Sequence, residues 1–276
     1  MKTVGVDIGG TKTAIGIIDT KTGKISTKLI FPSKSFKNDT KNLNLIIKKT
    51  LELSNDNKIK HIGIGVPELI NNKGIIKGNY NFNWNNLNLT KYFPKNNKIL
   101  VDSDVRCHLR AEKFFGVAKH YKNFAYINIG TGLSYAQFKE NEIYSGAKGY
   151  AIHFASSKIS LYDWKKNKKI SLVPEDYYSG KEIIKILNIK NTNTKKRIMK
   201  DVAESLASLI GSLINTIDPA KLVLGGGVIM NNTDFTKILI SSIRNYILAE
   251  EVKTISIITS KHKDNTGLLG AGLLFK

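Results

Sequence analysis

Short apolar runs that stop at glycine-rich turns set the pattern of the chain. The first run, residues 3–8, is rich in β-branched side chains and ends at Gly9-Gly10, and a second run, residues 14–18, returns from that turn. A third run, residues 25–31, follows another short polar turn. Apolar β-branched runs bounded by glycine and polar clusters predict strands. We therefore expect the N-terminus to form an antiparallel three-stranded meander.

The rest of the first half predicts helices that alternate with buried strands. Apolar residues recur every three or four positions over residues 39–54, which is helical spacing. Residues 61–66 form an apolar run that ends at a proline, and residues 98–101 form another that leads into a helical pattern over 104–115. Gly116 then marks the expected boundary between two lobes.

The second half repeats the opening pattern. An apolar run over residues 124–129 enters the turn Gly130-Thr131-Gly132, and residues 133–139 return from it. A later strand, residues 221–224, enters Gly225-Gly226-Gly227. The other expected elements are an irregular polar stretch over 156–178, helices over 180–187 and 195–217, a strand over 254–258 and a final helix over 266–274. Because both halves open with strand, glycine turn and returning strand, we expect an internal duplication and two lobes with a cleft between them.

The composition is that of a globular protein. The 276 residues suggest two domains at ~100–200 residues each, and 41% of the residues are hydrophobic. A single cysteine, Cys107, leaves no intramolecular disulfide and no cysteine-based zinc site. No apolar run approaches the ~20 residues of a membrane span, and an acid and glycines interrupt the N-terminus too early for a signal peptide. We therefore expect a cytoplasmic location and no membrane partner.

The formal charge of +21, with a pI near 9.8, matters for function only if the basic residues are concentrated. A dense basic face would indicate a nucleic-acid partner. The lysines are instead scattered among asparagine and isoleucine, and arginine, the better phosphate ligand, is scarce. We interpret the excess as a Lys/Asn/Ile compositional bias and expect no nucleic-acid partner. Attraction of an anionic substrate, such as a nucleotide or polyphosphate, is the second interpretation.

The glycine turns are the candidate phosphate-binding elements, because glycine exposes backbone amides that can cradle phosphate oxygens. A Walker A motif is excluded, since Thr11 stands where that motif requires lysine. A dinucleotide fingerprint is excluded, since Gly63-Ile64-Gly65 continues to Glu68 and no helix opens there. There remains an Asp-x-Gly-Gly-Thr-Lys hairpin at residues 7–12, which alone is more often a simple turn. A second glycine turn after an apolar strand, at residues 130–132, favours phosphate binding at both turns.

In their order along the chain, these motifs resemble the ROK family (repressor, open reading frame, kinase) of the actin/hexokinase-like superfamily. The resemblance covers nearly the whole chain. The matching segments are the first phosphate loop at 6–12, the strand end at 63–67, the sugar-side loop at 81–84, the catalytic segment from Ser103-Asp104 to Phe115-Gly116, the second phosphate loop at 130–132, the start of the sugar signature at 146–151, the adenosine-side loop at 224–228 and the last helix at 265–271.

The resemblance implies an α/β fold of the two-lobed actin-like ATPase (ribonuclease H-like) type, with a central cleft. The N-terminal lobe would comprise residues 1–115, completed by the C-terminal helix at 265–276, and the C-terminal lobe would comprise residues 116–264. The resemblance also implies an ATP-dependent sugar kinase that uses Mg²⁺, takes glucose as its default substrate and forms a homodimer.

The resemblance assigns roles to individual residues. Asp104 would be the general base that accepts the proton of the sugar hydroxyl, with a purely structural N-cap as the alternative. Asp7 would hold Mg²⁺ through water, because Mg²⁺ keeps several waters and needs one or two carboxylates; otherwise Asp7 would cap the hairpin. The phosphate contacts would come from Gly9, Gly10, Thr11, Lys12, Gly130, Thr131, Gly132, Gly225, Gly226 and Gly227, with a solvated position as the alternative for Lys12.

The sequence departs from the family pattern mainly on the sugar side. In the signature Gly-x-Ala-Gly-Glu-x-Gly-His, His153 replaces the sugar-binding glutamate, Ser156 replaces the histidine and Ile152 replaces a glycine. The zinc cysteines are absent from residues 157–173, so we expect no structural zinc. Val105-Arg106 replaces the usual Ala-Asn. The expected sugar-side residues are Glu68, which replaces a glycine and could supply the missing acceptor, Asn81, Ser103, which replaces an asparagine, Asp104, His153 and Glu175.

Several functions stay open at this point. The first is a sugar kinase whose substrate is shifted by the changes around His153. The second is a catalytically weak or inactive relative that binds sugar or nucleotide, and the third is a polyphosphate-dependent sugar kinase, motivated by the +21 charge. A transcriptional repressor of the same family would need an N-terminal helix-turn-helix, for which the segment before Asp7 leaves no room.

Overall fold

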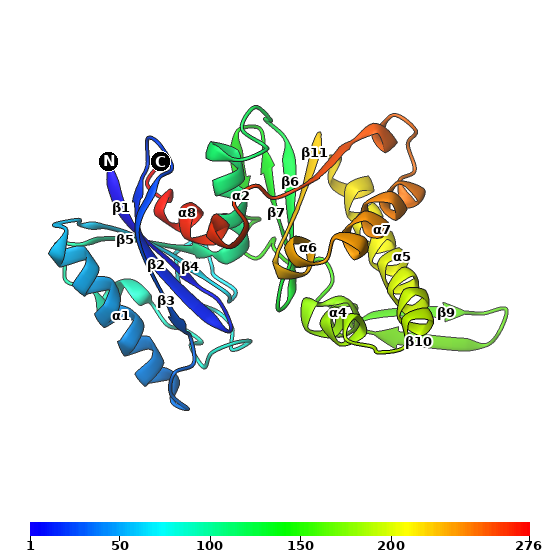
Figure 1. Cartoon of the computed structure of the whole chain (residues 1–276), viewed down its shortest axis with the longest axis horizontal. Coiled ribbons are helices and arrows are strands. Elements are labelled where there is room, and N and C mark those ends of the chain that lie inside the picture. Colours follow the sequence, from blue (N-terminus) through cyan, green and yellow to red (C-terminus); the bar gives the residue numbers. More distant parts are fainter. The chain divides into compact units, whose positions relative to one another are not determined.

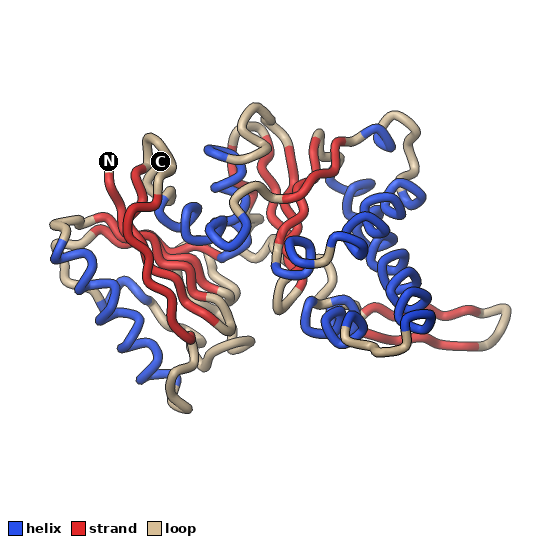
Figure 2. The backbone as a smooth tube through the Cα atoms, in the orientation of Figure 1, coloured by secondary structure: helices blue, strands red, loops and turns tan.

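The computed structural model describes residues 1–276, shown in Figures 1 and 2. The chain forms two compact units. Unit 1 comprises Met1–Lys122, Ala136–Ala151 and Asp264–Lys276, and unit 2 comprises Asn123–Tyr135 and Ile152–Lys263. These units differ from the expected lobes, which placed residues 116–122 and 136–151 with the second lobe. None of the helices combines the length and the hydrophobicity needed to cross a lipid bilayer.

Unit 1 is built on a five-stranded mixed sheet with the strand order β3-β2-β1-β4-β5. The first three strands form the predicted antiparallel meander, and β4 and β5 continue the sheet in parallel beside β1. The elements of this unit are β1 (Lys2–Ile8), β2 (Lys12–Asp19), β3 (Ile25–Pro32), α1 (Asp39–Asp56), β4 (His61–Val66), β5 (Lys98–Ser103), α2 (Asp104–Phe115), α8 (Thr266–Gly272) and a 3₁₀ turn at Leu89–Tyr92.

The two faces of this sheet carry different helices, because side chains alternate along a strand. On one face, residues such as Val6 of β1 share an apolar core with Ile46 of α1. On the other face, a Cβ atom at Gly5 would lie 2.6 Å from the carbonyl oxygen of Leu268 in α8. Glycine therefore lets the C-terminal helix lie directly on β1, as Figure 1 shows for the red α8 and the blue β1. Alternation puts Asp7 on the same face as Gly5, next to α8.

Unit 2 centres on three parallel strands, β12, β11 and β6, which belong to a sheet of order β12-β11-β6-β7-β8. Helices α5 and α7 contribute to one large apolar core with these strands. The other elements of this unit are β6 (Phe124–Ile129), α4 (Gly180–Leu187), α5 (Thr192–Ile217), β11 (Lys221–Gly225), α6 (Gly227–Asn231), α7 (Thr233–Ile243), β12 (Ser256–Thr259) and 3₁₀ turns at Arg244–Tyr246 and Val252–Thr254. Strand β7 (Leu133–Lys139) begins in unit 2 and ends in unit 1, β8 (Glu142–Tyr144) belongs to unit 1, and a 3₁₀ turn at Lys263–Asn265 lies at a boundary between the units.

The segment Ala136–Ala151 groups with unit 1 because specific contacts hold it there. The guanidinium of Arg106 donates through Nη1 to the carbonyl oxygen of Gly149 at 2.9 Å, and Asn72 donates to the carbonyl oxygen of Ala147 at 3.0 Å. Gly149 also packs so closely that a Cβ atom there would lie 2.5 Å from the carbonyl oxygen of Ile70. These pairs are far apart in sequence, which explains why a boundary drawn at Gly116 missed them.

The stretch expected to be irregular, residues 156–178, instead contains a hairpin and a short helix. Strands β9 (Ile159–Asp163) and β10 (Lys168–Leu172) pair antiparallel, and α3 (Glu175–Tyr178) follows. Leu161 pairs with Ile170 across the hairpin, and both side chains are exposed. The expectation of irregular structure was wrong here, because the apolar alternation extends over only three residues in each strand, which is shorter than the four to eight that a strand prediction uses.

Candidate active site

The first glycine turn connects β1 to β2 and is closed by the backbone. The amide of Gly9 donates to the carbonyl oxygen of Lys12 at 2.9 Å. A Cβ atom at Gly10 would lie 2.7 Å from Oδ1 of Asn81, so glycine allows the sugar-side loop to lie against the turn. Thr11 and Lys12 are exposed. The structure thus brings Asn81 to the turn that carries the four predicted phosphate contacts of this unit.

Asp7, near the end of β1, is partly buried. The start of α8 packs directly onto it, since a Cβ atom at Gly267 would collide with both carboxylate oxygens. This desolvation raises the pKa of Asp7 to about 6, against the lowering effect of the positive charges of Lys12 and Lys28. The sequence did not single out Gly267, although it lies in the glycine-rich final helix, and a close approach of this kind is what glycine permits.

Asp104 is the first residue of α2, and it is not the residue that caps this helix. The N-cap is Ser103, whose hydroxyl accepts from the amide of Arg106 at 3.4 Å. The carboxylate of Asp104 instead accepts from the amide of Val105 at 2.7 Å and is partly exposed. Burial raises the pKa of Asp104 to about 7, with a further upward contribution from the negative charge of Asp7. The N-cap alternative for Asp104 is therefore wrong, and Ser103 carries that role.

Glu68 is buried, and its carboxylate organises the loop that carries Asn81. The backbone amides of Tyr80, Asn81 and Phe82 donate to it at 2.9, 2.5 and 3.0 Å. The side chain of Asn81 donates in turn to the carbonyl oxygen of Pro67 at 2.6 Å. Glu68 therefore contributes to a site by holding Asn81 in place, whereas its direct contact with a sugar stays a prediction.

In unit 2, the turn at Gly130-Thr131-Gly132 is tied to Glu175. The carboxylate of Glu175 accepts from the amide of Leu133 at 2.7 Å, and a Cβ atom at Gly132 would lie 2.7 Å from the same oxygen. The structure thus places Glu175, predicted on the sugar side, directly against the second phosphate turn.

The third glycine turn lies beside the second. Gly226 has φ +95°, and a Cβ atom there would collide with the carbonyl group of Ile129 at the end of β6. A Cβ atom at Gly180 would likewise collide with the carbonyl group of Gly130. Gly180 was not predicted as a site residue, yet it shapes the turn because it begins α4 in direct contact with it. In unit 2 the structure therefore brings together the turns at 130–132 and 225–227.

The two altered positions of the sugar signature contact each other. Nδ1 of His153 and Oγ of Ser156 lie 2.9 Å apart. Burial lowers the pKa of His153, with a partly compensating contribution from the negative charge of Glu175. His153 is therefore predominantly neutral at pH 7, and a neutral imidazole can donate from one nitrogen and accept at the other.

The oxygen donors of unit 1 fit Mg²⁺ better than a metal that needs several protein ligands. No group of three or more His, Cys, Asp or Glu side chains is placed to hold an ion. Mg²⁺ needs only one or two carboxylates, since it keeps several waters and also binds substrate phosphates. Asp7 fits this requirement, because its partly exposed carboxylate lies at the base of a turn with exposed backbone.

Comparison with known proteins identifies the family of the chain. A sequence model of the ROK family matches residues 3–155 and 155–276. A glucokinase from Thermotoga maritima is 22% identical over 312 residues, covering 100% of this chain and 98% of that protein. A xylose repressor from Bacillus subtilis is 23% identical over 227 residues, covering 76% of this chain and 59% of that protein.

Solved structures support the same assignment at the level of the fold. The structure of a ROK family glucokinase from Streptomyces griseus, in complex with glucose and AMPPNP, superposes with a TM-score of 0.80 at 18% identity, covering 99% of this chain and 98% of that one. Together with the family match, this confirms the predicted α/β, actin-like ATPase fold. The chain belongs to the ROK family.

Proposed function

We propose that this protein is an ATP-dependent sugar kinase that phosphorylates a hydroxyl of a hexose or hexose derivative, with glucose as the default substrate. The observation that carries the proposal is the carboxylate of Asp104. This carboxylate lies at the start of α2 and is partly exposed, and it does not cap the helix because Ser103 does so. Its pKa of about 7 suits a general base at neutral pH. Full-length relatives of similar sequence include the glucokinase described above.

The proposed reaction needs positioning, charge neutralisation and a base rather than covalent catalysis by the protein. Asp104 would accept the proton of the sugar hydroxyl as the hydroxyl oxygen attacks the γ-phosphorus. Asp7 would hold Mg²⁺ through water, and that ion would neutralise charge on the phosphates. Because burial disfavours the charged form of Asp7, a bound cation would favour its ionised state.

The phosphates would be bound by the glycine turns. Backbone amides of residues 9–12 in unit 1, and of residues 130–132 and 225–227 in unit 2, are the proposed donors. Lys12 lies 3.4 Å from Asp264 in an ion pair whose two side chains are largely exposed. Exposed ion pairs contribute only ~0–1 kcal/mol to stability. Lys12 can therefore leave Asp264 and bind a phosphate at little cost in free energy.

On the sugar side, we propose that Asn81 and His153 contact hydroxyls directly. Ser103 is fully buried and caps α2, so it would position Asp104. Glu68 and Glu175 would act through the backbone segments that they hold, with Glu175 also close enough to influence the charge of His153. We further propose that the enzyme works in the cytoplasm as a homodimer.

The test is a coupled ADP-release screen over hexoses and N-acetylhexosamines with purified protein and its Asp104→Asn variant. Turnover on at least one sugar, abolished in the variant while nucleotide binding is retained, is the expected result. Unchanged turnover in the variant would remove Asp104 as the base. Nucleotide binding without turnover on any sugar would favour the weak or inactive relative. Replacing ATP by polyphosphate at several salt concentrations identifies the phosphate donor.

A further inference from the structure

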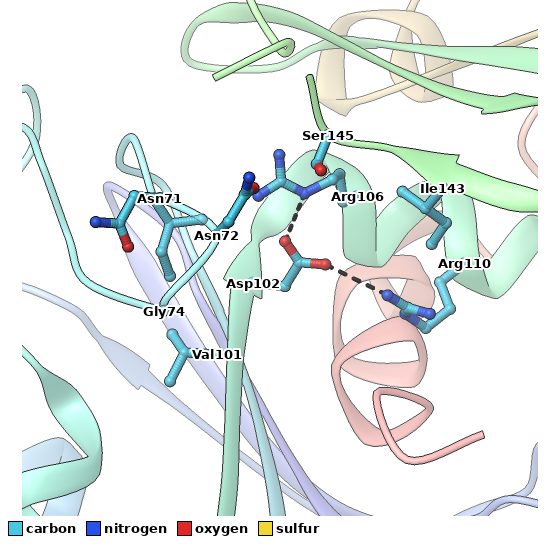
Figure 3. Close-up of a pocket in the computed structure, with 10 residues that line it drawn as sticks. Asn71, Asn72, Gly74, Val101, Asp102, Arg106, Arg110, Ile143 and Ser145 are labelled. Carbon is cyan, nitrogen blue, oxygen red and sulfur yellow. Dashed lines mark hydrogen bonds and ion pairs between the residues drawn. The ribbon is translucent and has the colours of Figure 1, made fainter. Parts of the chain in front are cut away.

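Unit 1 contains a pocket that is lined by none of the predicted site residues. It lies at the end of β5 and along one face of α2, with a volume of 230 Å³ (Figure 3). Its polar lining consists of Asn71, Asn72, Asp102, Arg106, Arg110 and Ser145. Unlike the glycine turns, this pocket presents charged side chains rather than backbone.

Arginine is the unusual feature of the pocket. The chain has 43 basic residues, of which only four are arginines, and two of these four line this one pocket. Arg106 and Arg110 are one helical turn apart on α2 and therefore share a face. Arg106 also stands where the family pattern has asparagine, so this pair is not explained by the ROK motif.

One carboxylate joins the two arginines, as the dashed lines in Figure 3 show. Nε of Arg106 lies 2.5 Å from Oδ1 of Asp102, and Nη2 of Arg110 lies 3.3 Å from Oδ2. All three side chains are at least four-fifths buried, with exposed fractions of 4, 18 and 16% for Arg106, Arg110 and Asp102. Two positive charges facing one negative charge leave the pocket with a net charge of +1.

One donor in this cluster is not satisfied by the protein. Nε of Arg110 is buried and has no hydrogen-bond partner. The neighbouring carboxylate oxygen Oδ1 of Asp102 already accepts from both Nε of Arg106 and the amide of Ser103. More than ~90% of buried polar groups in native proteins are paired, and leaving one unpaired costs about 1–3 kcal/mol. An acceptor with negative charge, bound beside Arg106 and Arg110, would balance the net charge of the pocket.

We propose that this pocket is a second ligand site, which binds a small oxyanion such as a phosphate or carboxylate group. The planar fork of arginine matches both groups, and charge-assisted bonds of this kind are stronger than neutral ones. The pocket is several times larger than the ~30 Å³ that one water occupies, so an oxyanion with accompanying waters fits. The proposal does not depend on the kinase activity.

Arginine Nε–H signals in a ¹H–¹⁵N spectrum test the site directly. The chain has four such groups, and the glycine turns contain none of them, so phosphate bound at those turns does not interfere. Single Arg→Lys variants assign the signals. Titrating inorganic phosphate at low chloride up to about 10 mM, enough for a site with Kd near 1 mM, should shift the signals of Arg106 and Arg110 until they saturate. The signals of Arg197 and Arg244 should stay in place.

Variants make the result specific. In Arg110→Met, the signal of Arg106 should no longer respond to phosphate, whereas Arg197→Met, a change at an exposed arginine of α5, should leave the response intact. Should Arg110→Met not fold, Arg110→Lys keeps the charge but lacks the Nε–H fork, and it should weaken phosphate binding about tenfold. A parallel titration with acetate separates the two ligand chemistries: the tighter of the two probes identifies the group.

Two outcomes would overturn the proposal. In the first, the Arg106 and Arg110 signals do not move with either phosphate or acetate, which leaves the cluster as a purely structural ion pair. In the second, all four arginine signals drift together without saturating, which is general ionic screening rather than a site.

Discussion

Asp7 in unit 1 and Glu175 in unit 2 both lie against a glycine turn that follows a strand, but their oxygens do different things. The carboxylate of Glu175 accepts the amide of Leu133 and fixes the turn. The carboxylate of Asp7 is covered by the start of α8, and desolvation raises its pKa to about 6. A carboxylate that accepts an amide from a distant segment is part of the scaffold, whereas one that is desolvated and holds no distant segment is available to a cation or a proton.

The same difference separates Glu68 from Asp104. Glu68 accepts three backbone amides and holds a loop, whereas Asp104 accepts only the amide of the adjacent Val105 and has a pKa of about 7. Of the three carboxylates compared in unit 1, Asp7 and Asp104 are therefore poised for chemistry and Glu68 is committed to structure. In unit 2, backbone turns dominate, and Glu175 is committed to structure. The predictions below test this contrast.

The largest effect should come from removing the base. We expect Asp104→Asn to lower kcat by about 10²–10⁴-fold, the usual contribution of general acid–base catalysis, with nucleotide affinity unchanged. Glu175→Gln keeps an oxygen that accepts the Leu133 amide, so we expect it to lower kcat by less than about tenfold. Steady-state kinetics on the best sugar substrate measures both. If Glu175→Gln lowered kcat as much as Asp104→Asn does, Glu175 would take part in catalysis, and the contrast between the two units would be wrong.

The next effect concerns the backbone of unit 2. Gly226→Ala should lower the free energy of unfolding by about 2–5 kcal/mol, because it combines a strained positive φ with overpacking against Ile129. Gly227→Ala is the matched control, since a Cβ atom there meets nothing within 4 Å. Urea unfolding of the two variants gives the difference. Equal stability would mean that the turn at 225–227 is not held by this close approach.

The acidic pair of unit 1 should make stability depend on pH. The folded-state pKa values of about 6 and 7 exceed the 3.8 of an unperturbed aspartate, so the folded state binds more protons than the unfolded state. The free energy of unfolding therefore falls as pH rises from about 4 to about 7. Asp104→Asn removes one of the two partly buried carboxylates, and with it part of this loss of stability at high pH. We expect the variant to be more stable than the wild type by on the order of 2 kcal/mol at pH 8, with a smaller gain at pH 5.

The control for this prediction is Asp56→Asn, a change at an exposed carboxylate near the end of α1. Its effect on urea unfolding should be the same at pH 5 and pH 8. A gain for Asp104→Asn that did not grow with pH would contradict the desolvation of Asp104, and would remove the physical basis for its pKa near 7.

The smallest effect should come from the helix cap. Ser103→Ala should lower the free energy of unfolding by about 0.5–1 kcal/mol. This is the low end of the range for N-caps, because the hydroxyl lies 3.4 Å from the amide of Arg106 and the bond is long. Ser103→Asn supplies another good cap and should restore stability. If Ser103→Ala raised KM strongly at unchanged stability, Ser103 would be a sugar ligand rather than a cap. Thermal unfolding together with kinetics separates these two roles.

Much of the fold could be predicted because the signals are local. The apolar runs around the turns at 9–12 and 130–132 gave strands at the right places, and helical spacing gave α1, α2 and α5. The β9–β10 hairpin was missed because its apolar alternation extends over only three residues in each strand, Ile159–Leu161 and Ile170–Leu172. The grouping of Ala136–Ala151 with unit 1 was missed because it depends on contacts such as Arg106 with Gly149, which no local pattern encodes.

The sequence by itself determined the family, the order of the strands and glycine turns, and the identity of Asp7 and Asp104 as candidate acids, since each depends on residue type and spacing. Only the tertiary structure decided what these acids do. It placed α8 on Asp7, gave the cap of α2 to Ser103, and committed Glu68 and Glu175 to backbone amides. Burial and hydrogen bonding set the proton affinity of a carboxylate, and both arise from residues far apart in the chain.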